Sequence, residues 1–318
     1  MNVPRIVCVS VNPAIDRRLR FDALVLGRVN RALSAENFPG GKSAHVAMVA
    51  QALGGHPAWL GFLGGGVGKE FEREFAGEKV EVAPIYTRRR TRMNLELIDG
   101  AGRVTEMLEP GERPSPDEVR KMQRRLAAGL RGRWRGAVVV ISGSLPAGMK
   151  PGFYGALIRA AKAAGSRVFL DTSGRALKAG LAAQPEFIKP NREEAEALLG
   201  RKLRALVRIA DAAHELVARG AASAAISLGA QGLVWVERKN GATWLARPPQ
   251  MKAISTVGCG DATVAGFAIA AARQLTGADA IRLAAACGAA NCLAKSPGKV
   301  SARGVKMLAP RVRIERLD

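Results

Sequence analysis

A glycine-flanked acid near the C-terminus is the strongest chemical signal in this sequence. Gly258 and Gly260 flank Cys259, and Asp261 then opens an apolar segment of helical character. Glycine allows a tight turn, and the free N–H groups at the start of a helix attract an anion. Such donors stabilise a moving phosphoryl group, while a nearby carboxylate takes the proton of the attacking hydroxyl. We therefore predict Asp261 as the catalytic base and the three preceding residues as backbone donors. The competing interpretation is a simple helix cap.

A second glycine turn, at Gly40 and Gly41, also precedes an apolar helical segment. Glycine pairs before helices are common in loops, so neither turn identifies a protein by itself. Several short motifs accompany the two turns: Asn12–Asp16, Thr91–Leu95, Ile141–Pro146, Asp171–Gly174, Ile188–Asn191 and Ile226–Gly229. With these motifs in this order, the chain from about Ile6 onward resembles the ribokinase-like carbohydrate kinases of the phosphofructokinase B family.

The resemblance implies an α/β fold, in which a ribokinase-like, mostly parallel central sheet is flanked by helices and a small β-sheet forms a lid over the sugar. We expect one kinase domain across residues 1–318, with lid strands within about 16–30 and 90–110. Apolar runs alternate with helical segments from about residue 137 onward, as is typical of a parallel sheet. Alternation with period two at Asp16–Asp22, Arg92–Ile98 and Arg103–Leu108 indicates the separate small sheet. In this family such lids often pair between subunits, which implies a homodimer.

Ligands of a parallel α/β sheet lie at the carboxyl ends of its strands. The glycine-containing motifs near residues 40, 143, 172, 229 and 258 all follow predicted strands or turns of that kind. We therefore expect them to share one cleft.

The resemblance assigns the sugar to residues near the N-terminus. Asp16 would accept hydrogen bonds from sugar hydroxyls, and Gly40 and Gly41 would allow the backbone to approach the sugar. His45 stands where relatives commonly carry asparagine, another sugar ligand. Histidine retains one hydrogen bond but differs in shape. From the residues alone, Asp16 is equally a surface acid and His45 equally a packed core residue.

The resemblance is closest to the branch that phosphorylates hexose phosphates, and a phosphosugar needs cations. Arg92 matches the arginine that binds the sugar phosphate in that branch, and Ser144 matches a hydroxyl donor beside it. Arg28 stands where a basic residue can reach the phosphate, either in its own subunit or from the partner subunit. We interpret the run Arg88–Arg90 as solvated.

The nucleotide side is assigned in the same way. Lys189, Asn191 and Glu194 match a family motif whose acid organises Mg²⁺, often through water, and one carboxylate suits this ion. Asn191 and Glu194 also have the spacing of a helix capping box, and both roles are compatible. The resemblance further implies a loop under the ATP phosphates and ribose, formed by Ser227, Gly229 and Gly232.

The formal net charge of +22 is unusual for a metabolic enzyme of 318 residues. We interpret it as an arginine-rich solvated surface that attracts phosphorylated metabolites and ATP. Aromatic residues make up only 5% of the chain, so no stacking platform for nucleic acid is expected. No membrane span or signal peptide is expected either.

Four cysteines show neither metal spacing nor a disulfide framework. This usage favours a cytoplasmic protein. We interpret Cys8, Cys287 and Cys292 as buried thiols. The helix start should lower the pKa of Cys259 and make this thiol sensitive to alkylation.

The leading hypothesis is ATP-dependent phosphorylation of tagatose 6-phosphate or fructose 1-phosphate, which the sequence does not separate, although three segments resemble the tagatose-phosphate side slightly more. Fructose 6-phosphate and an unphosphorylated sugar or nucleoside are alternatives within the fold. A non-catalytic, basic nucleic-acid-binding protein is the alternative of another class.

Overall fold

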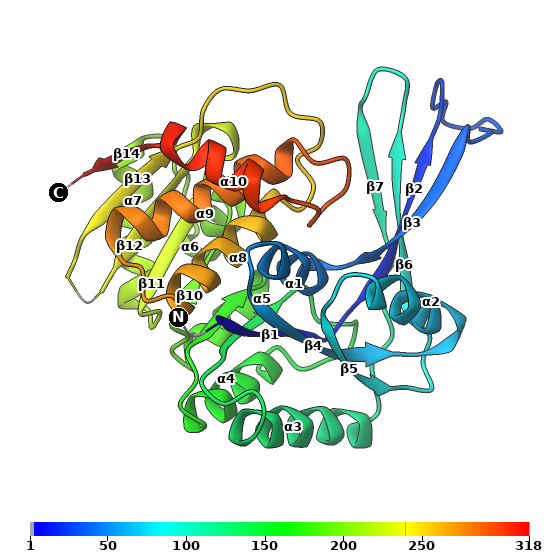
Figure 1. Ribbon diagram of the computed structural model, residues 1–318, viewed down its shortest axis with the longest axis horizontal. Helices are drawn as coiled ribbons and strands as arrows, with labels where there is room; N and C mark the ends of the chain where they lie inside the picture. Colours follow the sequence, from blue (N-terminus) through cyan, green and yellow to red (C-terminus); the bar gives the residue numbers. More distant parts are fainter. Residues whose placement is uncertain (1–2, 239, 318) are drawn as a thin grey trace.

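A computed structural model describes residues 3–238 and 240–317, and a large twisted sheet runs through its centre (Figure 1). Ten strands form this sheet, in the spatial order β14 (Arg313–Arg316), β13 (Thr243–Arg247), β12 (Leu233–Glu237), β11 (Ser223–Ser227), β10 (Phe187–Ile188), β9 (Val168–Asp171), β8 (Val138–Ser142), β1 (Arg5–Ser10), β4 (His56–Leu63) and β5 (Glu81–Tyr86). All pairs from β5 to β11 are parallel, and β12, β13 and β14 add an antiparallel edge. The mostly parallel α/β fold is therefore confirmed.

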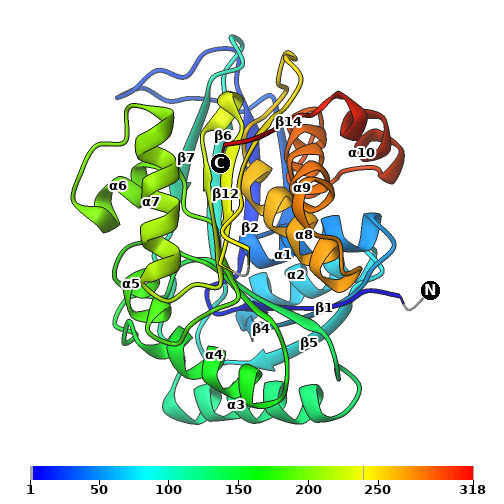
Figure 2. The ribbon, with the colours of Figure 1, turned by 90° about the vertical axis from the view of Figure 1, so that its left-hand side faces the viewer.

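The central strands are apolar on both faces because helices cover both faces. Every residue of β8 is buried, as expected for a strand between two helical layers. Figure 2 shows the two layers. The helices of one layer are α1 (Lys42–Ala52), α2 (Gly65–Ala76), α8 (Cys259–Ala272), α9 (Gly277–Cys292) and α10 (Ala302–Leu308). The helices of the other are α3 (Pro116–Arg131), α4 (Phe153–Ala163), α5 (Gly174–Leu181), α6 (Arg192–Leu199) and α7 (Leu206–Ala218).

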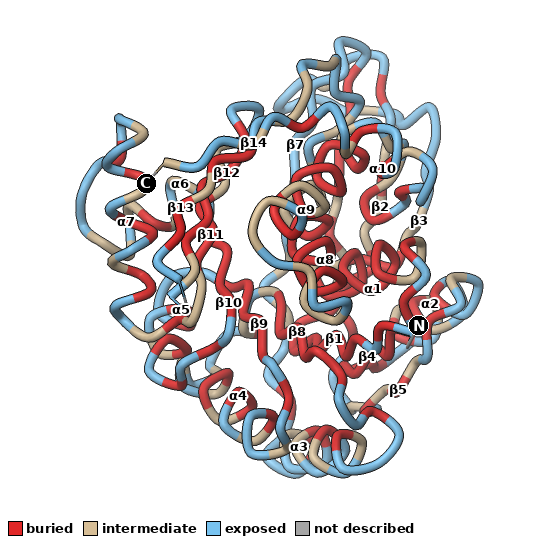
Figure 3. The backbone as a smooth tube through the Cα atoms, turned by 60° about the vertical axis from the view of Figure 1, so that its left-hand side comes forward, coloured by how far each residue is buried: buried red, intermediate tan, exposed pale blue. Residues whose placement is uncertain are grey.

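Helix α8 is apolar on all sides because it lies between α1 and α9 in the buried part of the first layer (Figure 3). A helix with this composition belongs in a core. Gly266 brings α8 against α9, since a Cβ atom there would lie 2.6 Å from the Cα atom of Ala284. This close packing fixes the position of the turn that begins α8.

The arginine-rich segment around residues 120–135 forms most of α3 and the turn after it. Leu126 and Leu130 lie four positions apart on one face and are buried, while the basic side chains of the segment are exposed. Ser115 and Glu118 close the start of the helix with a capping box. Among the described residues, no helix is both long and apolar enough to cross a membrane.

A second sheet of four strands stands apart from the body (Figure 1). Its order is β3 (Ser34–Gly40), β2 (Ala14–Arg20), β6 (Arg92–Ile98) and β7 (Val104–Leu108). Strands β2, β6 and β7 lie where the period-two alternation predicts them. Strand β3 was not predicted, because Ser34–Gly40 lacks that alternation and contains a proline and a terminal glycine. It lies at the edge of the sheet, where proline is tolerated.

A buried arginine, Arg18, connects the small sheet to the body. The Arg18 guanidinium lies 2.7 Å from the Glu96 carboxylate across β2 and β6, and both side chains are almost fully buried. Arg18 also donates to the backbone carbonyl of Lys295 in the loop after α9. Its guanidinium stacks over Phe38, 5.2 Å from the ring centre. Arg18 therefore links strand β2 of the small sheet to the loop after α9.

Candidate active site

A cleft of about 1900 Å³ lies between the small sheet and the carboxyl ends of the main strands. It brings together nearly all of the predicted site residues: Asp16, Gly41, His45, Arg92, Ser144, Lys189, Asn191, Glu194, Ser227, Gly229, Gly232, Gly258, Cys259, Gly260 and Asp261. Arg28 and Gly40 are the two that do not line it.

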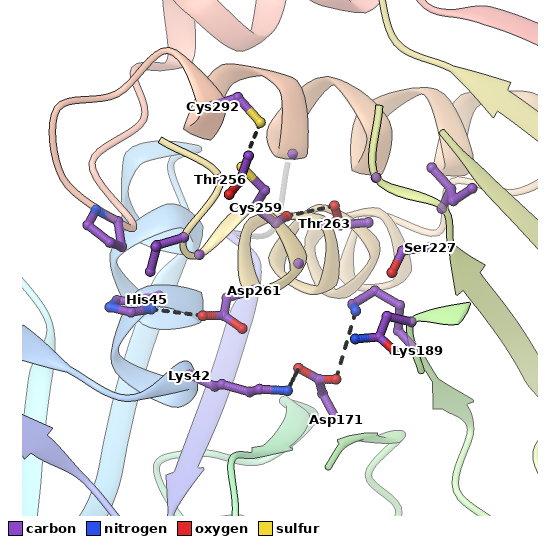
Figure 4. A pocket seen from close by; sticks show the side chains of 18 of the residues that line it. Lys42, His45, Asp171, Lys189, Ser227, Thr256, Cys259, Asp261, Thr263 and Cys292 are labelled. Atoms are coloured by element: carbon purple, nitrogen blue, oxygen red, sulfur yellow. Dashed lines mark hydrogen bonds and ion pairs between the residues drawn. The ribbon is translucent and has the colours of Figure 1, made fainter. Parts of the chain in front are cut away.

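The turn at the start of α8 has the conformation that the glycines predict. Gly258 has a φ of 76° and is the N-cap, so Cys259 is the first helical residue and Asp261 the third. A Cβ atom at Gly260 would meet the Lys189 ammonium at 3.3 Å. Asp261 is thus not the N-cap. Its carboxylate instead faces His45 in the cleft (Figure 4).

His45 lies between two carboxylates. Its Nδ1 atom is 2.8 Å from Asp261 Oδ2, and its Nε2 atom is 3.5 Å from Asp16 Oδ2. Burial alone would lower the pKa of His45, but hydrogen bonds to Asp16 and Asp261 outweigh it and raise the pKa to about 10. His45 is therefore an imidazolium at neutral pH, and its positive charge lies between the two carboxyl groups. Sequence reasoning placed His45 on the sugar and missed its contact with Asp261.

A His45→Asn variant should have a stability that depends less on pH than that of the parent. A folded-state pKa raised from about 6.5 to about 10 means that the folded protein binds the extra proton. The stabilisation is complete below pH 6.5 and is lost as the pH rises through 10. We expect the free energy of unfolding of the parent to fall more steeply between these pH values. Urea titrations measure this, with exposed His56→Asn as the control. Equal slopes in the parent and His45→Asn would contradict the ion-pair assignment.

Gly40 lies outside the cleft and leaves room for the Asp16 carboxylate. It pairs with Ala14 across β2 and β3, and a Cβ atom at this position would overlap the Asp16 carboxylate at 2.2 Å. Gly41 has a φ of 85° and is the N-cap of α1. Asn94 donates a hydrogen bond of 2.7 Å to Asp16 Oδ1, which orients the same carboxylate.

Arg92 begins β6 of the small sheet, Ser144 lies in the turn after β8, and Asn12 connects them across the cleft wall. Arg92 donates to the backbone carbonyls of Asn12 and Glu109, at 3.3 and 2.6 Å. Asn12 donates to Ser144 Oγ at 3.2 Å. Arginine keeps its charge even when largely buried. This part of the cleft can bind an anion.

The opposite part of the cleft is built from the turns after β10 and β11. Asn191 Oδ1 accepts from the Glu194 N–H at 2.7 Å, and Glu194 Oε2 accepts from the Asn191 N–H at 2.9 Å, so the predicted capping box is present. Gly229 and Gly232 have φ values of 59° and 102°. A Cβ atom at Gly232 would overlap the Ala246 carbonyl at 1.9 Å, so this turn requires glycine.

The comparison with protein families settles what kind of enzyme contains this cleft. Residues 6–302 match the profile described as pfkB family carbohydrate kinase. The chain belongs to that family. The prediction of an ATP-dependent carbohydrate kinase with a ribokinase-like fold is thereby confirmed.

Individual relatives agree with the family. This pfkB kinase is 39% identical to a 1-phosphofructokinase of Xanthomonas campestris pv. campestris, over 83% of each chain. It is 37% identical to a 1-phosphofructokinase of Rhodobacter capsulatus, over 89% of this chain and 88% of the relative. Among solved structures, Escherichia coli phosphofructokinase-2 in complex with fructose-6-phosphate superimposes with a TM-score of 0.87 at 29% identity, covering 98% of this chain and 99% of the other.

Two residues that line the cleft of this pfkB kinase, Lys42 and Asp171, were not predicted as site residues, although Asp171 begins a quoted motif. Lys42 follows Gly41 directly, and its ammonium lies 3.4 Å from Asp171 Oδ2. Lys189 approaches Asp171 Oδ1 at 3.9 Å, so one carboxylate lies between two lysines (Figure 4). Asp171 raises the pKa of Lys42, and this effect exceeds that of burial, which lowers it. A lysine directly after a glycine turn was the available sequence signal.

Arg28 is exposed in the loop between β2 and β3 and does not reach the cleft of its own chain. The expectation that it binds the sugar phosphate therefore requires a second copy of the chain.

Proposed function

We propose that this kinase transfers the γ-phosphoryl group of ATP to a hydroxyl of fructose 1-phosphate. The observation that carries the proposal is one continuous cleft with an anion-binding arginine, Arg92, on its lid side and a backbone-donor turn with a carboxylate, Asp261, in its interior. The relatives named 1-phosphofructokinase favour fructose 1-phosphate over tagatose 6-phosphate as the acceptor.

In this proposal Asp261 is the base that removes the proton of the acceptor hydroxyl. His45 engages Asp261 Oδ2, which leaves Oδ1 for the hydroxyl. The N–H groups of the turn at Gly258–Gly260 would stabilise the charge that develops on the transferred phosphoryl group, although the Cys259 N–H also donates to the Thr256 carbonyl at 3.3 Å. Lys42 and Lys189, both in the cleft, would neutralise phosphate oxygens.

Mg²⁺ would be held jointly by Glu194 and the nucleotide. Among the described residues there is no group of three or more His, Cys, Asp and Glu side chains that could hold a metal ion. Mg²⁺ usually takes one or two carboxylates, keeps several waters and binds the phosphates of its substrate, so Glu194 on the cleft wall fits. When bound, the ion supplies positive charge to the phosphates.

A coupled ADP-release assay with Mg-ATP tests the proposal. The panel contains fructose 1-phosphate, tagatose 6-phosphate, fructose 6-phosphate, fructose and a nucleoside. We expect the highest kcat/KM for fructose 1-phosphate. A higher value for an unphosphorylated acceptor would overturn the sugar-phosphate assignment. No turnover with any acceptor, together with tight DNA binding at physiological salt, would instead favour the nucleic-acid alternative.

We also propose that the kinase is a homodimer paired through its lid. The lid loop exposes large apolar side chains, including Leu26 and Val29 at 88% and 83% exposure. Isolated exposed apolar residues are ordinary, but a group of them marks an interaction surface. Arg28 lies between these two residues in the same loop, so pairing would carry it toward the cleft of the partner. One solved relative is described as a tetrameric inhibited form, so a larger assembly is the competing state.

A Leu26→Asp/Val29→Asp double variant should sediment as a monomer where the parent sediments as a dimer. Two buried charges without partners at such an interface would cost several kcal/mol. Val207→Asp is the matched control, because Val207 is also exposed but lies on α7. A parent that sediments as a monomer, or a double variant that remains dimeric, would contradict lid pairing.

A further inference from the structure

Two cysteines that are 33 positions apart meet beside the catalytic turn. Cys259 is the first residue of α8, and Cys292 is the last residue of α9. Their sulfur atoms lie 2.6 Å apart, and both are free thiols. Both residues line the cleft and are partly exposed (Figure 4). The expectation that Cys292 is a buried thiol was therefore wrong.

The geometry is close to that of a covalent bond. A disulfide has an S–S distance of about 2.05 Å, so the two sulfurs need to approach by only about half an ångström. Cys259 begins α8 and Cys292 ends α9, and the two helices pack against each other. The fold therefore already holds the two thiols together, as oxidation to a disulfide requires. No large backbone movement is needed to join them.

The pair also has the acid–base chemistry of a reactive dithiol. The hydrogen bond from Cys259 lowers the pKa of Cys292. That same bond, followed by burial, raises the pKa of Cys259. The expected lowering of the pKa of Cys259 was therefore wrong, because the hydrogen bond to Cys292 and burial both raise it. Cys292 is then the nucleophile and Cys259 the thiol that resolves its oxidised form.

The other two cysteines do not compete for oxidants. Cys8 and Cys287 are fully buried, and burial raises the pKa of each thiol, for Cys287 to about 12. Reactive thiols are exposed and easily ionised. Oxidation should therefore be confined to the pair in the cleft.

We propose that Cys259 and Cys292 are a reversible oxidation site at which a peroxide forms a disulfide and stops phosphoryl transfer. The Cys292 thiolate attacks one peroxide oxygen, the O–O bond breaks, and a sulfenic acid and hydroxide result; the hydroxide takes up the proton that the thiol released and becomes water. The Cys259 thiol then attacks the sulfenic sulfur, the S–O bond breaks, and a second water leaves. Two thiols and one hydrogen peroxide thus give one disulfide and two waters. Each sulfur loses one electron, and the two peroxide oxygens are reduced.

The disulfide would act on the turn that holds the phosphoryl group. Asn291 donates to the Val257 carbonyl at 2.8 Å and to Cys259 Sγ at 3.5 Å. Drawing Cys259 toward Cys292 therefore changes both sides of the turn. Asp261 follows two residues later in the same helical turn. Misplacing a catalytic group by about 1 Å can cost about 100-fold in rate, so a shift of half that size should cost about tenfold.

The test treats the full-length enzyme with hydrogen peroxide and then with dithiothreitol. Mass spectrometry of peptides should show a Cys259–Cys292 disulfide, and kcat should fall by about tenfold and recover on reduction. The loss of kcat rests on the proposed kinase function, whereas the disulfide is detected without any assay of activity. Failure of one is therefore distinguishable from failure of the other.

A Cys292→Ala variant is the decisive comparison. It removes the nucleophile without altering the catalytic turn, so it should keep its activity and resist peroxide. Cys287→Ala, from the same helix, should remain as sensitive as the parent. The proposal is overturned if Cys292→Ala is inactivated as fast as the parent, if no disulfide is found, or if the disulfide forms and kcat is unchanged.

Discussion

Replacing Asp261 by asparagine is expected to lower kcat by about 10²–10⁴-fold, the usual contribution of a positioned general base. Asparagine has nearly the same shape but accepts no proton. The N-cap of α8 is Gly258, which makes no side-chain capping hydrogen bond, so the helix start should survive the change. Steady-state kinetics with saturating Mg-ATP and sugar phosphate give kcat, and isothermal titration gives the affinity for ATP, which we expect to be largely kept.

An Asp279→Asn variant is the matched control for Asp261→Asn. Asp279 also lies in the first turn of a helix, α9, but outside the cleft. This control should retain the activity of the parent. If Asp261→Asn itself turns over at nearly the parental rate, Asp261 is not the base and serves only the helix and His45.

Replacing Arg92 by alanine is expected to raise the KM for a sugar phosphate by about 10- to 150-fold, which corresponds to the roughly 1.5–3 kcal/mol of a charge-assisted hydrogen bond. Arg92 faces the cleft with its guanidinium held by backbone carbonyls of Asn12 and Glu109. The KM for the same sugar without its phosphate should change much less. Initial-rate measurements with paired substrates separate the two effects.

Arg90→Ala is the control for Arg92→Ala, because Arg90 is exposed and pairs only with the Glu109 carboxylate at 3.1 Å among the contacts of the described residues. Its substitution should leave both KM values near those of the parent. A proportional rise of both KM values in Arg92→Ala would mean that this residue supports the cleft and does not recognise phosphate.

Local features of the chain were predictable because they depend on neighbours in the sequence. Gly41, Gly229, Gly232 and Gly258 adopt positive φ values, which glycine accepts because it lacks a Cβ atom. The capping box of Asn191 and Glu194 follows from a spacing of three residues. Strand β8 follows from its continuous apolar run. Helix α3 follows from the spacing of Leu126 and Leu130, four positions apart. The motifs shared with the family predicted which residues form the site, and most of these residues line one cleft.

Strands without a clean pattern were not predictable in this way. Ser34–Gly40 becomes β3 because β2 offers it an open edge, and nothing in its own alternation indicates a strand. The antiparallel strands β12, β13 and β14 likewise extend the sheet through pairing with a neighbour that only the folded chain provides.

The sequence by itself determined the type of chemistry, through the glycine turn and acid at Gly258–Asp261 and the motifs that accompany them. Only the tertiary structure decided which groups act on one another. His45 meets Asp261 across 216 positions, and Cys259 meets Cys292 across 33. The first contact raises the pKa of His45, and the second raises the pKa of Cys259 and lowers that of Cys292. The physical reason is that hydrogen bonds and charge interactions act over a few ångströms in space, whereas sequence periodicity records only which side of an element is buried.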